Sequence, residues 1–372
     1  MNPQATHPTR QNENPDRSTY KQEGPPTGGI LNDLISVVIP NFNGEDTLGR
    51  AVTSVLSQSH THIQLIVVDD CSTDNSVAFL RQKVNDPRLL IAEHQKNRML
   101  GATRNTGMSL AVGAYLFFLD ADDFLLPDAL KILLTRAKEC NADVVQGASL
   151  RLNAKGKSSM YHQAEFISDG GIDGLQHFSD HRFASVAWNK LYRRDLFENG
   201  TGLRFIEQYM HEDVPFAMTC AFKARRIVSI ATPVMCYTEN TKSMVGRSPN
   251  RLNMESYAFL YLKLMELCHD FDLYSNPTGI ALARRIIKAH GTDDIIPKLM
   301  RCLDEMGRAK FEETLSEVGF SLAGRHGMVA ASLVGGFTSL LLDTQATKPQ
   351  KKSQNPLKVI KRLIGKRDQR TR

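Results

Sequence analysis

Three carboxylates directly follow a short apolar run in the first half of the chain. The run covers residues 115–119, and Asp120, Asp122 and Asp123 come immediately after it. Carboxylates packed together repel one another and raise one another's pKa unless a cation neutralises them. Their hard oxygen atoms suit Mg²⁺ or Mn²⁺, and a metal held by one or two carboxylates keeps coordination positions open for substrate phosphates. The spacing therefore predicts a metal site that handles phosphate groups.

Apolar runs of strand length alternate with helical patterns over the same part of the chain. The strand-like runs cover residues 35–40, 63–68, 89–92 and 115–119. Between them, apolar residues recur at the three- and four-residue spacing of a helix, in Leu48, Val52, Val55 and Leu56, then in Val77, Leu80 and Val84, and finally across 99–112. The alternation predicts an α/β fold with a mostly parallel, doubly wound sheet. Thr73 or Asp74 is predicted to cap the second helix.

Polar side chains stand at the ends of three of these predicted strands. Asn41 follows the first strand, Asp69 and Asp70 end the second, and Asp120 to Asp123 follow the fourth. Ligands of doubly wound sheets bind beyond the carboxyl ends of the strands. We therefore expect these side chains to line one cleft.

Three other classes of protein place acids at strand ends, and the spacing argues against each. Receiver domains carry their acid pair after the first strand and are far shorter than 372 residues. Haloacid-dehalogenase phosphatases have Thr or Val two places after the second acid, where this chain has Phe124. Nicotinamide-binding folds have Gly-x-Gly-x-x-Gly after the first strand, which residues 40–44 do not match.

Four short motifs occur in order between residues 34 and 240. They are Val38-Ile39-Pro40-Asn41-Phe42-Asn43, Val68-Asp69-Asp70-Cys71-Ser72-Thr73-Asp74, Arg104-Asn105-Thr106-Gly107 and Asp120-Ala121-Asp122-Asp123. Their residues and intervals resemble the successive signatures of family 2 inverting glycosyltransferases, although any one motif alone is weak. The resemblance implies a GT-A catalytic domain, with its Rossmann-like sheet, of the non-processive bacterial envelope or polysaccharide type.

The resemblance assigns the first two motifs to the nucleotide of a sugar donor. Pro40, Asn41 and Asn43 are expected to line the nucleotide pocket. The carboxylate of Asp70 is expected to accept a hydrogen bond from the nucleobase. A hydrogen-bond acceptor at this position matches the N–H group of a uracil-like base. A UDP-sugar is therefore the favoured glycosyl donor.

The resemblance assigns the other two motifs to the diphosphate and its metal. Arg98 and Arg104 are expected near the diphosphate, with an exposed helix charge as the alternative for Arg104. Asp122 is expected to bind Mn²⁺ or Mg²⁺ that bridges both phosphates, and Asp120 to contact the ribose or a metal-bound water. Asp123 is expected to support these residues or to begin the next turn.

Glycosyl transfer also needs a base, because the acceptor hydroxyl loses a proton as it attacks. Glu212 and Asp213 precede an apolar helical pattern and resemble the family's Glu-Asp motif, which makes Asp213 the base and Glu212 the alternative. Acids in a first helical turn can also merely compensate the helix dipole. The preceding stretch 187–194, at the interval seen in the family, favours the catalytic interpretation.

The same stretch supplies candidates for contacts with the acceptor or its sugar. Trp188, the only tryptophan, is assigned either to a sugar-stacking platform or to the core, and Lys190 is assigned to the acceptor side. The chain lacks the Gln-x-x-Arg-Trp motif and the several membrane spans of processive synthases. We therefore expect single-residue addition, with a β-type linkage from an α-linked donor.

Composition divides the chain into five predicted segments. They are a disordered N-terminal tail without a signal peptide (1–33), a GT-A domain (34–245), a helical C-terminal region (246–326), an apolar helix (327–343) and a basic amphipathic tail (344–372). The apolar helix falls short of the ~20 residues that span a membrane, so it is predicted to lie in the membrane plane or to be buried. The six cysteines lack zinc or redox spacing and are predicted to be reduced.

Positive charge is concentrated at the C-terminal end. Residues 348–372 hold ten Lys and Arg against one acid, whereas the whole chain has a net charge of +6. Leu357, Ile360, Leu363 and Ile364 fall on one helical face beside these charges, a pattern typical of a helix on anionic lipid. A solvated tail is the alternative. The tail has no interleaved aromatic residues, so no nucleic-acid partner is expected.

These features together predict an inverting, metal-dependent glycosyltransferase that moves a hexosyl or N-acetylhexosaminyl group. The expected acceptor is a lipid-linked or cell-envelope glycan, and the expected location is the cytoplasm, at the inner face of the cell membrane. One alternative is a nucleotidyltransferase of the same fold. Another is a catalytically silent, membrane-associated protein that binds nucleotide sugars. The donor sugar, the linkage and the oligomeric state are left open.

Overall fold

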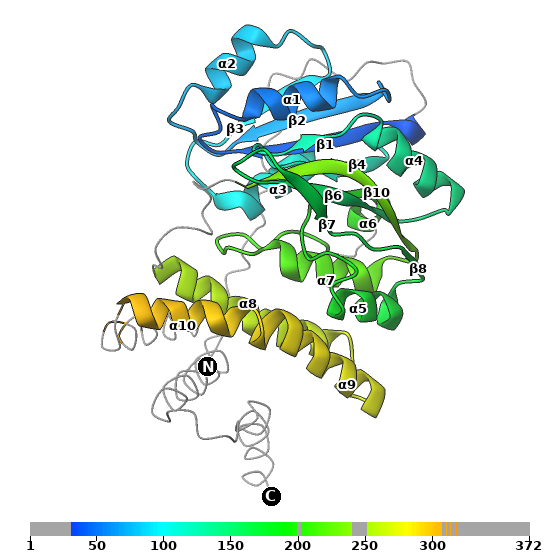
Figure 1. Cartoon of the computed structure of the whole chain (residues 1–372), viewed down its shortest axis with the longest axis vertical. Helices are drawn as coiled ribbons and strands as arrows, with labels where there is room; N and C mark the ends of the chain where they lie inside the picture. The colour runs from blue at the N-terminus through cyan, green and yellow to red at the C-terminus, as the bar shows by residue number, and fades with distance from the viewer. Residues whose placement is uncertain are drawn as a thin grey trace, which may run out of the picture.

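The computed structural model describes residues 31–198, 202–239 and 251–306, together with Lys310, Glu313 and Glu317. Its centre is a 10-stranded sheet with the strand order β3-β2-β1-β4-β9-β6-β10-β5, in which β7 also pairs with β6 and β8 with β10. Figure 1 shows helices on both sides of the sheet and a further layer of helices, α8 to α10, beneath α5 and α7. The predicted segments 327–343 and 344–372, and residues 1–30, lie outside the described residues.

The first half of the sheet is parallel, as the sequence predicts. β1 pairs in parallel with β2 and with β4, and β2 pairs in parallel with β3. The elements are β1 (Ile35–Asn41), α1 (Leu48–Leu56), β2 (Ile63–Asp69), α2 (Ser76–Lys83), β3 (Leu89–Glu93), α3 (Met99–Leu110) and β4 (Tyr115–Phe118). Because these strands run the same way, their carboxyl ends, and the polar residues that follow them, meet at one edge.

The second half of the sheet contains an antiparallel strand that the sequence did not indicate. β9 is antiparallel to both β4 and β6, whereas β6 and β10 are parallel to each other. The elements are β5 (Phe124–Leu125), α4 (Ala129–Glu139), β6 (Val144–Leu152), β7 (Ser158–Tyr161), β8 (Phe166–Ser168), α5 (Gly171–Ser179), β9 (Lys190–Arg193), α6 (Asp195–Glu198), α7 (Asp213–Lys223) and β10 (Ile227–Thr238). β9 therefore begins at the edge where β4 ends.

Both faces of the sheet are covered. Val38 of β1 packs in one apolar cluster with residues of α3, α5, α7 and α8, and its neighbours Val37 and Ile39 pack in another with residues of α1 and α4. A strand covered on both faces carries apolar residues at every position rather than at alternate ones. This explains the nearly continuous apolar runs in the sequence, which only Ser36 and Gln64 interrupt in β1 and β2.

The predicted cap of α2 is wrong by one or two positions. The helix begins at Ser76 with Asn75 as its N-terminal flanking residue, and the Asn75 side chain does not cap it. Asp74, one of the two predicted residues, accepts a hydrogen bond from the backbone N–H of Ser76 at 3.1 Å from one position further out. The turn before α2 is held by contacts with the β1 loop, which a local reading of the sequence cannot anticipate.

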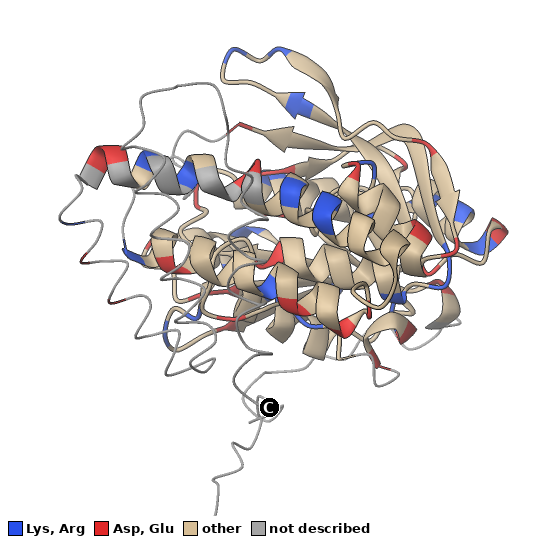
Figure 2. Cartoon of the chain, turned by 90° about the horizontal axis from the view of Figure 1, so that it is seen from below, with Lys and Arg blue, Asp and Glu red and all other residues tan. Residues whose placement is uncertain are grey.

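Three long helices follow the sheet: α8 (Arg251–Asp270), α9 (Pro277–Ile286) and α10 (Ile295–Met306). An apolar stripe of α8 is buried and belongs to the same cluster as α5 and α7; it includes Tyr257, Leu260, Leu264 and Leu267. Seen from the side of these helices, acidic and basic residues are interspersed (Figure 2). Among the described residues, no helix combines the length and apolar character needed to cross a membrane.

Candidate active site

The loops after β1 and β2 are tied together at the carboxyl edge. The side-chain amide of Asn41 donates to Asp69 at 2.7 Å and to Ser76 at 3.0 Å. Asn43, in the left-handed region at φ 53°, accepts from the backbone N–H of Thr73 at 2.8 Å. Pro40 is buried inside β1. The predicted nucleotide residues of the first motif thus lie beside those of the second.

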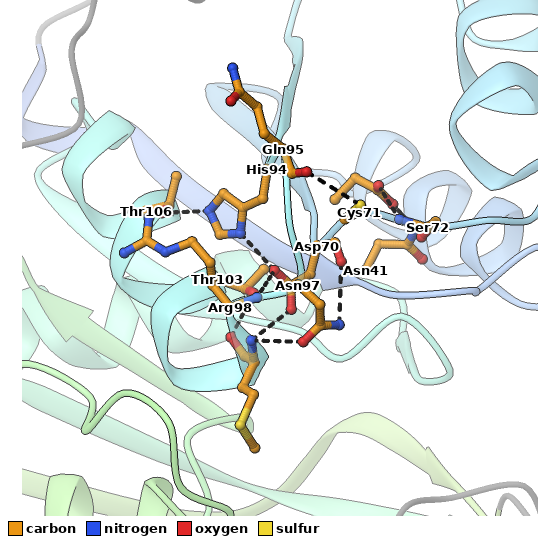
Figure 3. Close-up of polar contacts among 12 residues, drawn as sticks. Asn41, Asp70, Cys71, Ser72, His94, Gln95, Asn97, Arg98, Thr103 and Thr106 are labelled. Carbon is orange, nitrogen blue, oxygen red and sulfur yellow. Dashed lines mark hydrogen bonds and ion pairs between the residues drawn. The ribbon is translucent and has the colours of Figure 1, made fainter.

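Asp70 is the centre of a buried polar cluster (Figure 3). Its carboxylate contacts Nδ1 of His94 at 2.7 Å and accepts from the backbone N–H groups of Arg98 and Met99, each at 2.8 Å. Nε2 of His94 contacts the hydroxyl of Thr106 at 2.9 Å. Burial acts to raise the pKa of Asp70, but these hydrogen bonds outweigh it and lower the pKa. Asp70 is therefore a fixed, ionised acceptor.

The acids after β4 occupy different surroundings. Asp123 is fully buried; one of its oxygens accepts from the backbone N–H of Thr238 at 2.8 Å, and the other has no hydrogen-bond partner within the described part of the chain. Burial, together with the charges of Asp120 and Asp122, raises the pKa of Asp123 well above its ordinary value. Arg50 donates to the backbone carbonyl of Asp122 at 2.6 Å. The backbone N–H of Asp123 donates to the carbonyl of Asp120 at 3.0 Å, so a tight turn holds the three acids together.

The donor set fits a metal shared with substrate better than one enclosed by protein. Among the residues that the structure describes, no three His, Cys, Asp or Glu side chains form a group able to hold a metal ion. Asp122 is half-buried at the sheet edge. A cation at this carboxylate would need further oxygen atoms, and phosphates are the usual source of them for Mg²⁺.

Arg104 joins the acids after β4 to those at the start of α7. The side chain is 1% exposed; one terminal nitrogen donates to Asp120 at 2.7 Å and the other to Glu212 at 2.5 Å. Burial alone would lower the pKa of Arg104, but the charges of Asp120, Glu212 and Asp213 raise it. The guanidinium carbon also lies 5.3 Å from the ring centre of Phe205. The alternative of an exposed helix charge is therefore wrong.

The predicted base lies at the first position of α7, next to this ion pair. Glu212 is 4% exposed and Asp213 is half-buried. Burial raises the pKa of Glu212 to about 7 and also raises the pKa of Asp213, while the charge of Arg104 opposes both shifts. Because Glu212 is buried and bound to Arg104, Asp213 is the more accessible of the two carboxylates.

The segment that carries these acids is fixed on both sides. Asn105 of α3 exchanges two hydrogen bonds of 2.9 Å with the backbone of Phe205. A Cβ atom on Gly101 would lie 2.2 Å from the carbonyl oxygen of Ile206, so only glycine permits this approach. On the other side, the hydroxyl of Ser256 in α8 accepts from the backbone N–H of Met210 at 3.0 Å. The helical layer therefore supports the base.

Trp188 and Lys190 lie deeper than a direct sugar contact requires. Trp188 is 5% exposed and Lys190 0%. The amino group of Lys190 donates to the carbonyl of Val186 at 2.8 Å and to the Asn189 side chain at 3.0 Å, and burial lowers its pKa to about 7. The structure thus places Trp188 in the core, which is one of the two positions predicted for it. Lys190 is buried below the carboxyl edge of the sheet rather than exposed on the acceptor side.

Some contacts of the site carried no signal in the sequence. His94, Asn105 and Ser256 orient the predicted residues through bonds to Asp70, Phe205 and Met210. Asn105 falls within the third motif, which could have identified it. His94 and Ser256 stand in no motif, and only the folded chain shows their partners.

Known proteins are similar to this chain in sequence and in fold. The sequence profile described as Glycosyl transferase family 2 matches residues 36–201. The chain is 29% identical over 241 residues to the uncharacterized glycosyltransferase YibD of Escherichia coli (strain K12), covering 62% of this chain and 70% of YibD. It is 27% identical over 215 residues to the uncharacterized glycosyltransferase EpsJ of Bacillus subtilis (strain 168), covering 57% of this chain and 62% of EpsJ.

Similarity extends to a named polysaccharide protein and to a solved structure. The chain is 33% identical over 132 residues to the succinoglycan biosynthesis protein ExoO of Rhizobium meliloti (strain 1021), covering 35% of this chain and 38% of ExoO. The crystal structure of S. aureus TarS 1–349 in complex with UDP-GlcNAc superposes with a TM-score of 0.60 at 20% identity, covering 84% of this chain and 87% of that chain. The similarity to TarS shows a shared fold.

The sheet and its covering helices have the GT-A fold of TarS, and the sequence matches place the chain among glycosyltransferases. More particularly, residues 36–201 match the sequence profile of Glycosyl transferase family 2. The predicted fold class, family domain and enzyme class are therefore confirmed.

Replacing Arg104 with methionine should destabilise the protein strongly, because three acids lose their buried countercharge. We expect a loss of about 3–5 kcal/mol in the free energy of unfolding, measured in urea. The loss should be smaller at pH 5 than at pH 8, because Glu212 is protonated at the lower pH and needs no cation.

Arg98→Ala is the matched control, since the Arg98 side chain forms an exposed ion pair with Glu207. It should cost less than about 1 kcal/mol. Equal losses in the two variants, or a loss for Arg104→Met that does not depend on pH, would contradict the role given to the buried pair.

Proposed function

We propose that the protein transfers one sugar, with inversion, from a nucleotide-diphosphate donor to a hydroxyl of a lipid-linked or cell-envelope glycan. A UDP-sugar is the favoured donor, carrying a hexosyl or N-acetylhexosaminyl group. The observation that carries the proposal is the bridge from Asp120 through Arg104 to Glu212. This bridge brings the segment that carries Asp213, the proposed base, close to Asp120, one of the acids proposed for the donor side.

Asp213 is the proposed base. Its raised pKa, caused first by burial, brings the carboxyl closer to the working pH, where a general base is most effective. Glu212, with an oxygen already bound to Arg104, is assigned to holding the loop. Asp213 would take the proton from the acceptor hydroxyl as its oxygen attacks the anomeric carbon from the face opposite the diphosphate.

The donor side is proposed to use the residues at the ends of β1, β2 and β4. Asp70, kept ionised by its buried hydrogen bonds, is an acceptor for a nucleobase N–H. Asn41 and Asn43 shape the adjoining loops, and Asp122 would hold Mn²⁺ or Mg²⁺. That cation, when bound, neutralises negative charge on the departing nucleoside diphosphate.

Names of similar proteins agree with this donor and acceptor. TarS, which shares the fold, was crystallised with UDP-GlcNAc, and ExoO is named for succinoglycan biosynthesis. The alternatives make different products: a nucleotidyltransferase would release pyrophosphate, and a silent binding protein would release nothing.

Screening UDP-sugars for UDP release, with Mn²⁺ or Mg²⁺ present, tests the proposal. One donor should be turned over, and chelation or Asp122→Ala should abolish the reaction. Asp213→Asn should lower turnover by about 10²–10⁴-fold, the usual contribution of a general base, yet bind UDP as tightly as the unmodified protein in calorimetry. Pyrophosphate release, or binding without turnover of any donor, would favour the alternatives. Equal loss of binding and turnover in Asp213→Asn would make that acid structural.

We also propose that the basic segment 348–372 holds the protein at the cytoplasmic face of an anionic membrane. Near such a surface each Lys or Arg contributes ~1 kcal/mol. Deleting the segment should release the protein from phosphatidylglycerol vesicles in a flotation assay, without changing turnover on a soluble acceptor. Vesicles of phosphatidylcholine alone are the control and should bind neither form. Undiminished binding of the shortened chain to anionic vesicles would reject the anchor.

A further inference from the structure

Three aromatic side chains gather at the carboxyl end of β10. The rings of Trp188 and Tyr237 are stacked, with centroids 5.5 Å apart and planes 10° apart. Tyr161, at the end of β7, lies 5.9 Å from Tyr237 and 6.4 Å from Trp188. The three residues come from separate parts of the chain, and neither tyrosine has a role in the mechanism above.

This aromatic cluster (Trp188, Tyr237 and Tyr161) adjoins the acids after β4. Cys236 pairs with Phe124 in the antiparallel ladder of β10 and β5, which brings the next residue of β10 level with Asp123. The backbone N–H after Tyr237 donates to the Asp123 carboxylate at 2.8 Å. Tyr237 therefore lies beside Asp123, the residue that follows the proposed metal ligand.

The cluster is layered from the core outward. Trp188 is buried, whereas both tyrosines are half-buried and keep part of their surface exposed. Beside them, Arg151 lies 5.8 Å from the ring centre of Tyr161 and forms an ion pair of 2.6 Å with Glu239. The aromatic cluster thus offers partly exposed ring surface, bordered by polar and charged groups, near Asp122, where the diphosphate is proposed to bind.

A pyranose ring has complementary chemistry. Its axial C–H groups make one face apolar, and this face packs on an aromatic ring while the hydroxyls at its rim reach polar neighbours. The predicted nucleotide residues lie at the ends of β1, β2 and β4, whereas Tyr237 lies on β10, toward the other end of the sheet order. The part of the substrate that extends past the diphosphate is a sugar.

We propose that Tyr237, supported from below by Trp188 and flanked by Tyr161, forms a subsite for a pyranose ring beside Asp122. The inference rests on the proposed function, because it takes the diphosphate to lie at Asp122. The ring belongs either to the donor sugar or to the terminal sugar of the acceptor, which share this chemistry. Trp188 thus acts on the sugar through Tyr237 rather than by direct contact.

Trp188 offers a direct readout, since it is the only tryptophan in the chain. The full-length protein is titrated, with Mn²⁺ present, with UDP, with UDP-GlcNAc, UDP-glucose and UDP-galactose, and with the methyl β-glycosides of the same sugars. UDP alone should leave the emission of Trp188 nearly unchanged. A change with a UDP-sugar assigns the subsite to the donor, and a change only with a glycoside added to the UDP complex assigns it to the acceptor.

Substitutions at Tyr237 separate stacking from other effects. Tyr237→Ala should abolish the emission change and raise the KM of the assigned sugar substrate about tenfold, equivalent to ~1.4 kcal/mol, while the affinity for UDP stays unchanged. Tyr237→Phe keeps the ring and should retain both properties. Tyr237→Leu keeps apolar bulk without the ring. It should lose the emission change and raise the KM as Tyr237→Ala does, and it provides the test should the alanine variant fold poorly.

Two different failures can be told apart. If the unmodified protein binds no UDP, the proposed function falls and the subsite with it. If UDP binds but sugars never change the Trp188 emission, or if Tyr237→Leu keeps the KM values of the unmodified protein, the subsite alone is overturned. Equal damage in Tyr237→Phe and Tyr237→Ala would also overturn it, because the hydroxyl rather than the ring would then be responsible.

Discussion

The guanidinium of Arg104 lies between two carboxylates that belong to opposite sides of the site, Asp120 after β4 and Glu212 before α7. A buried cation is costly unless it is paired, and buried carboxylates are costly unless they have a countercharge. The charges of Arg104, Asp120 and Glu212 therefore offset one another's cost of burial. The arrangement fixes the distance between the acids proposed for the donor and the acid proposed as the base.

The rest of the chain keeps that bridge in place. Helix α3 carries Arg104 and approaches the segment before α7 closely, through the absent side chain of Gly101 and the paired hydrogen bonds of Asn105. Helix α8 holds the same segment from the other side through Ser256. Through this contact the C-terminal helices help to position the proposed base. Hydrogen bonds likewise fix Asp70 at the proposed nucleotide end of the site.

Much of this could be predicted from the sequence, since parallel strands and their polar ends follow from local periodicity and motif spacing. The interior position of Arg104 could not, because its partner Glu212 is 108 positions away and helical spacing alone fits an exposed charge equally well. β9 was missed because it has only four residues, two of them basic. The place of Trp188 beneath Tyr237 depends on β9 and β10 both pairing with β6, and those pairings have no local signal. The tail 348–372 stays a prediction.

A double-mutant cycle on Asp120→Asn and Glu212→Gln tests the central role of Arg104 most directly. Each single variant leaves the guanidinium one of these two partners, whereas the double variant removes both. In urea unfolding at pH 8, the double variant should lose at least ~1 kcal/mol more than the sum of the two single losses. Losses that add to within ~0.5 kcal/mol would show that Arg104 does not couple the two acids, and would contradict this account.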